Sequence, residues 1–68
     1  MTRYIIVSRD RLLGGMHWSG TKWMNLAGTK ARVYKTKNSA YTIINRMTEK
    51  EPHELYWRIA RIEAVEAD

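Results

Sequence analysis

The chain has 68 residues and contains no cysteine, so it can form neither a disulfide framework nor a thiolate metal site. This absence fits a reducing, cytoplasmic setting. No apolar run approaches the roughly 20 residues that a membrane-spanning helix needs. The short apolar stretch Tyr4–Val7 follows a single arginine and is too short for a signal-peptide core. We therefore expect a cytoplasmic protein with no membrane partner, folded as one domain over residues 1–68.

Acidic residues are almost absent from the first two thirds of the chain. Residues 1–48 contain nine lysines and arginines but a single acid, Asp10, which gives a net charge of +8. Residues 49–68 contain three basic and six acidic residues, a net charge of −3. A basic body with an acidic C-terminal region indicates an anionic partner for the body. The alternative is that both regions are solvated surface.

The clearest structural signal is the stretch Ala31–Met47, which predicts a strand followed directly by a helix. Ala31–Lys35 is rich in β-forming residues and alternates charged with apolar side chains. Thr36 is a suitable helix N-cap, because its hydroxyl can accept a hydrogen bond from a free backbone N–H of the first turn. The apolar residues after it recur at i, i+3, i+4 and i+7, as Ala40, Ile43, Ile44 and Met47. This stripe must pack on a sheet, since so short a helix is marginal alone.

The N-terminal third predicts two further strands. Tyr4–Val7 is a continuous β-rich run, which favours a central strand covered on both faces. Ser8–Arg11 has the composition of a polar turn. The double glycine in Leu12–Trp18 favours a bent or bulged second strand.

Between these strands and the central stretch, the composition of Ser19–Lys22 predicts a turn. The two residues after it, Trp23 and Met24, are apolar. Asn25–Lys30 predicts a loop or a single helical turn.

After the helix, Thr48–His53 predicts a charged linker, because Pro52 cannot continue a helix. Glu54–Ala67 is compatible with either helix or strand. We favour a strand, with one bulge near residues 60–61 to restore the alternation of apolar side chains.

These elements predict an α+β fold in the order β-β-β-α-β, a small antiparallel sheet with one helix packed on one face. The apolar residues that should form its core are Tyr4, Ile6, Val33, Ala40, Ile43, Ile44, Met47, Trp57 and Ile59.

The chain resembles a loose group of small phage and prophage accessory proteins over about residues 4–64. The shared pattern is an opening strand such as Tyr4–Val7, a glycine-containing hairpin, a tryptophan such as Trp23, an Ala-Arg-aromatic strand such as residues 31–34, and a capped helix with an early alanine, here Ala40. The resemblance implies a viral or mobile-element origin and action in the host cytoplasm. It also implies binding and inhibition of a host or defence component.

Catalysis has little support in the sequence. His17 and His53 are the only histidines, and neither has a neighbour at metal-ligand spacing. We expect His17 to be at the surface, or partly buried with its hydrogen bonds satisfied. No serine lies in a nucleophile-elbow context, and no glycine-rich stretch has the spacing of a phosphate loop. We therefore expect a protein that is not an enzyme and that has no cofactor or metal.

Binding is better supported, because two tryptophans lie close in sequence to several cations, in the segment least needed for a core. The candidate binding residues are Arg9, Arg11, Trp18, Lys22, Trp23, Lys30 and Arg32. Our first hypothesis is an accessory protein that docks on a host or defence protein, with the tryptophans as interface anchors. A second is direct nucleic-acid binding, in which exposed tryptophans stack on bases. A third is an oligomeric sponge for a small anionic nucleotide. Alternatively, both tryptophans only fill the open edge of the sheet.

Overall fold

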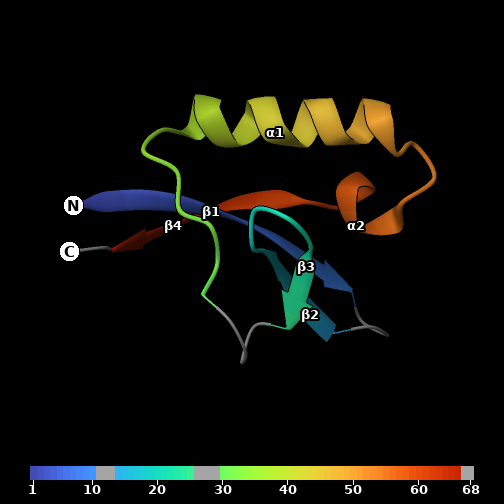
Figure 1. Cartoon of the computed structure of the whole chain (residues 1–68). Coiled ribbons are helices and arrows are strands. Elements are labelled where there is room, and N and C mark those ends of the chain that lie inside the picture. Colours follow the sequence, from blue (N-terminus) through green and yellow to red (C-terminus); the bar gives the residue numbers. More distant parts are fainter. Residues whose placement is uncertain (11–13, 26–29, 67–68) are drawn as a thin grey trace.

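A four-stranded antiparallel sheet with one long helix across it forms the fold in the computed structural model, which describes residues 1–10, 14–25 and 30–66 (Figure 1). The predicted α+β class is therefore confirmed. The elements in chain order are β1 (Thr2–Asp10), β2 (Gly14–Trp18), β3 (Trp23–Asn25), α1 (Lys37–Lys50), α2 (Leu55–Arg58) and β4 (Arg61–Glu66). Neither helix in these ranges is long and apolar enough to cross a membrane.

The strand β1 lies inside the sheet, whose order is β3-β2-β1-β4. Val7 is paired with His17 of β2 on one side and with Arg61 of β4 on the other. The predicted central position of Tyr4–Val7 is confirmed, and Val7 is fully buried. The predicted turn at Ser8–Arg11 is wrong for residues 8–10, because β1 continues to Asp10 and pairs with β2 there. Arg11 lies outside the described residues.

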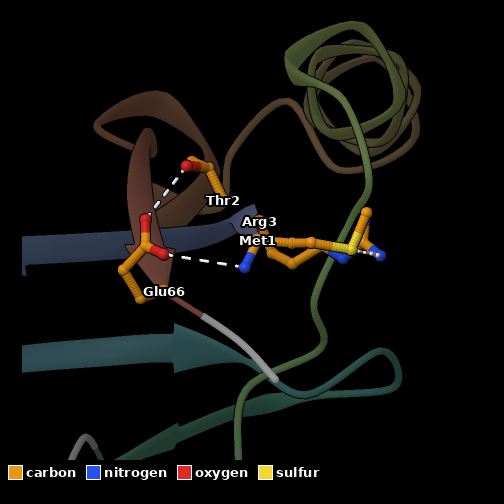
Figure 2. A network of polar contacts seen from close by, with 4 residues as sticks. All are labelled: Met1, Thr2, Arg3 and Glu66. Carbon is orange, nitrogen blue, oxygen red and sulfur yellow. Dashed lines mark hydrogen bonds and ion pairs between the residues drawn. The ribbon is translucent and has the colours of Figure 1, made fainter.

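A polar network joins the start of β1 to the end of β4 (Figure 2). The hydroxyl of Thr2 donates to Glu66 Oε1 at 3.0 Å, and the amino group of Met1 lies 3.7 Å from Glu66 Oε2. Arg3 Nη2 donates to Met1 Sδ at 3.5 Å. All of these contacts are exposed, so each stabilises the fold by less than about 1 kcal/mol.

The third strand is β3, and the predicted strand at Ala31–Lys35 is wrong. That segment makes one isolated bridge, in which Tyr34 and Tyr4 exchange backbone hydrogen bonds of 2.8 and 2.9 Å. The bridge forms because β2 pairs only with residues 7–10 of β1 and leaves its first half free on that side. Side chains alternate along an extended segment, so Val33 points away from the side of Tyr34. Val33 is 49% exposed and the prediction that it is a core residue is wrong.

The helix α1 begins where the sequence predicts. Thr36 is its N-cap, and the Thr36 hydroxyl accepts from the backbone N–H of Ser39 at 3.1 Å. The apolar stripe is confirmed: Ala40 is fully buried, and Ile43, Ile44 and Met47 pack against the same core. The helix continues through residues 48–50, which were predicted as linker, and ends two residues before Pro52.

The C-terminal segment contains both of the elements that its sequence allows. The favoured strand is wrong for residues 55–58, which form α2, and correct for residues 61–66, which form β4. Glu54 caps α2 by accepting from the backbone N–H of Tyr56 at 3.4 Å. Trp57 is in the core as predicted, but a helix places it there. Ile59 is only half-buried and lies outside the core cluster, as does Tyr4, and residue 67 lies outside the described residues.

Candidate functional site

The three tryptophans pack together in the core. Trp57 is 4.7 Å from both Trp18 and Trp23, measured between ring centroids, and Trp18 and Trp23 are 5.5 Å apart. Tyr56 extends the cluster, 5.6 Å from Trp23. Trp18 is only 7% exposed, so the hypothesis that its ring lies free at the surface is wrong. Trp18 is buried because it is paired with Trp23 in the β2–β3 hairpin. Opposite residues of a hairpin direct their side chains to the same face of the sheet, so the two rings pack together there.

A cleft of about 370 Å³ opens beside this cluster, between α1 and the segment 30–35. Part of its lining comes from one face of α1 and part from the extended segment. The residues that line the cleft are Trp18, Gly20, Arg32, Tyr34, Ile43, Arg46 and Met47. Among the described residues, this lining combines apolar and aromatic side chains with two arginines and contains no acid.

Tyr34 is the polar residue closest to the core in this cleft. Its hydroxyl interacts with the side chain of Trp18, whose indole N–H can only donate. Burial raises the pKa of Tyr34 above its ordinary value of 10.0, and the positive charge of Arg32 and the hydrogen bond from Trp18 oppose that rise. The hydroxyl therefore stays protonated at neutral pH.

Arg32 lines the cleft, where its backbone is hydrogen-bonded to β2 and its side chain lies beside Gly20. The backbone N–H of Arg32 donates to the carbonyl of Trp18 at 2.9 Å. Its aliphatic stem passes Gly20, where a Cβ would lie 3.6 Å from Arg32 Cδ. Gly20 has a φ of +105°, which the turn between β2 and β3 requires and which side-chain-bearing residues rarely adopt.

The other predicted binding residues lie outside the cleft. Arg9 forms an ion pair with Glu63 across β1 and β4, at 3.2 Å, so its charge is already compensated. Lys22 lies in the exposed turn next to Gly20, and Lys30 is exposed at the start of the cleft wall. Trp23 is in the core cluster, and Arg11 falls outside the described residues. Of the seven predicted residues, Trp18 and Arg32 line the cleft.

Sequence reasoning missed Tyr34 and Arg46. Arg46 follows Ile43 by three residues and directly precedes Met47, so helical periodicity places it beside the apolar stripe. That signal was present in the sequence. Tyr34 pairs with Tyr4 in the isolated bridge, and no local pattern in the sequence indicates the pairing of two residues so far apart.

His17 differs from its prediction. It is 2% exposed, and its Nε2 has no hydrogen-bond partner among the described residues, as is also true of the hydroxyl of Ser8. His17 is opposite Val7 in the sheet, so the pleat directs the His17 and Ser8 side chains to opposite faces. The two therefore do not form a serine–histidine pair. Within the described ranges, no group of three or more His, Asp or Glu side chains could hold a metal ion.

Comparisons with family models, with curated proteins and with solved structures gave no match for this chain. Functional assignment therefore depends on the geometry and charge of the cleft.

Proposed function

We propose that this protein acts by binding, without catalysis, and that its partner presents negative charge to the cleft face. We define the cleft face as the cleft, the 19–22 turn and the segment 30–37. The observation that supports the proposal is the distribution of charge. Residues 11–48 contain no acid. The ion pairs found in the described part of the chain lie elsewhere, at Arg9 with Glu63 and at Met1 with Glu66.

The cations of the cleft face are therefore uncompensated by any acid that the structure describes. They are Lys22, Lys30, Arg32, Lys35, Lys37 and Arg46. Lys37 lies 6.0 Å from the centre of the Tyr4 ring, a weak contact for an exposed amine. The start of α1 also lacks the acidic residues that would favour the helix dipole. The repulsion among these cations destabilises the free protein slightly, and an anion bound to the cleft face reduces that repulsion.

The partner that we favour is a protein with an acidic surface. Sequence-independent binding of single-stranded nucleic acid relies on exposed aromatic rings as stacking platforms. Trp18 and Trp23 are packed against Trp57, which weakens that hypothesis. The resemblance to phage accessory proteins supports the same choice, a host or defence protein that the chain binds and inhibits.

The experiment is affinity capture from lysate of the host cell, with and without nuclease, followed by direct titration of the isolated protein with mixed-sequence DNA. A protein partner retained after nuclease, with weak DNA binding, is the expected result. Loss of all captured protein after nuclease, together with tight DNA binding whose affinity falls steeply with salt, would favour nucleic acid as the partner.

A further inference from the structure

We propose that the cleft is a binding site for a small phosphate monoester carried on an apolar body, held by Arg32, Arg46 and Tyr34. This inference goes beyond the macromolecular partner proposed above, because it concerns a free small molecule, although both proposals use Arg32 and Arg46 of the cleft.

The polar groups of the cleft select for an acceptor-rich, doubly charged ligand. A guanidinium group has five N–H donors and no acceptor, and its planar fork suits phosphate oxygens. Arg32 and Arg46 both line the cleft, the first from the segment 30–35 and the second from α1. Tyr34 also lines the cleft, and its neutral hydroxyl can donate a third hydrogen bond. No acid of the described residues lines the cleft to repel an anion.

The charge of the ligand follows from these donors. A phosphate monoester carries about −1.5 to −2 at pH 7 and has three terminal oxygens, which matches two guanidinium groups and one hydroxyl. A carboxylate has one charge and two oxygens, so it would leave one arginine uncompensated. Charge-assisted hydrogen bonds of this kind are about twice as strong as neutral ones.

The remaining surface of the cleft fits an apolar body attached to that phosphate. Ile43 and Met47 of α1 line the cleft together with Trp18. The volume of about 370 Å³ is within the range of about 300–1,000 Å³ typical of small-molecule sites. Inorganic phosphate would leave this apolar surface exposed to water and should therefore bind more weakly.

The test is NMR titration of the full chain with phenyl phosphate, inorganic phosphate and phenol. Phenyl phosphate should bind with a Kd of about 1 mM or below, and each of the other two at least about tenfold more weakly. The shifts should include the indole N–H of Trp18, because Trp18 lines the cleft. Equal affinity for inorganic phosphate, or no binding of phenyl phosphate, would overturn the proposal.

Two variants locate the site. Arg32→Gln and Arg46→Gln should each weaken phenyl phosphate binding by about tenfold or more. Arg58→Gln is the matched control, because it removes the same charge from an exposed residue of α2 outside the cleft. All three side chains are exposed, so their variants should keep the fold, which circular dichroism checks. An equal loss in the control would contradict a defined site and indicate diffuse charge attraction.

Discussion

The backbones of Tyr4 and Tyr34 exchange two hydrogen bonds, of 2.9 Å from Tyr4 N to Tyr34 O and 2.8 Å from Tyr34 N to Tyr4 O. These bonds, with the one from Arg32 N to the carbonyl of Trp18, attach the segment 30–35 beside β1 and β2. They position one wall of the cleft. Other lining residues of the cleft, Ile43, Arg46 and Met47, belong to α1, so the cleft depends on both the extended segment and the helix.

The packing of α1 can be tested with a pair of adjacent residues. Ile44→Asp places an unpaired carboxylate against the core and should lower the free energy of unfolding by about 2–4 kcal/mol. Asn45→Asp is the control, because Asn45 is exposed and should change stability by about 0.5 kcal/mol or less. Thermal melts monitored by circular dichroism measure both. If the two variants melt alike, α1 is wrongly oriented on the sheet.

A second stability prediction concerns the buried indole of Trp57. Its Nε1 donates to Glu51 Oε2 at 3.2 Å, so Glu51→Ala leaves this donor without its partner. The variant should lose about 1–2 kcal/mol in urea denaturation. Glu49→Ala removes an exposed acid from the last turn of α1 and should have little effect. Equal losses in the two variants would mean that overall charge, and not this hydrogen bond, determines the change.

Alkaline pH should destabilise the fold through Tyr34. Burial raises its folded pKa above 10.0, so the neutral hydroxyl is preferred in the folded state. The resulting stabilisation is complete below pH 10 and is lost as the pH rises through the folded pKa. The free energy of unfolding should therefore fall less steeply above pH 10 in Tyr34→Phe than in the unmodified chain. Tyr41→Phe is the control, because Tyr41 is exposed on α1, and should leave the slope unchanged.

The isolated chain should bind mixed-sequence duplex DNA no more tightly than about 1 μM at physiological salt, the range expected of non-specific phosphate contacts. Fluorescence anisotropy with labelled DNA measures this affinity. Submicromolar binding, with a binding constant whose logarithm falls steeply with the logarithm of salt concentration, would indicate that the partner is nucleic acid and not a protein.

Apolar periodicity, β-forming residues and a helix-capping residue in the sequence predicted the helix α1 and the internal strand β1. Thr36 and the stripe from Ala40 to Met47 identify α1, and Tyr4–Val7 identifies the internal strand. Residues 55–58 were misassigned because Leu55 and Trp57 alternate as in a strand, while a capped turn of helix places Trp57 in the core. Tertiary packing overrode propensity there.

The cleft was harder to predict than the fold. Charge and residue type identified Arg32, but the burial of Trp18 depends on its pairing with Trp23 in the hairpin and on its contact with Trp57, 39 residues away in the chain. Tyr34 lines the cleft together with Trp18 because the backbone of Tyr34 is bridged to that of Tyr4. Such relationships between distant segments leave no periodic signal in the sequence.

The central claim is that the cleft face binds an anionic partner, and charge reversal tests it most directly. The affinity of the captured partner should be measured for the unmodified chain, for Arg32→Glu with Arg46→Glu, and for Arg58→Glu with Arg61→Glu, two exposed residues outside the cleft face. Both double variants change the net charge by the same amount. The account predicts that the first loses binding by at least about 100-fold, since two charge-assisted contacts are removed, while the second retains it within a few-fold. Equal losses in the two double variants, or full binding by the first, would contradict the account.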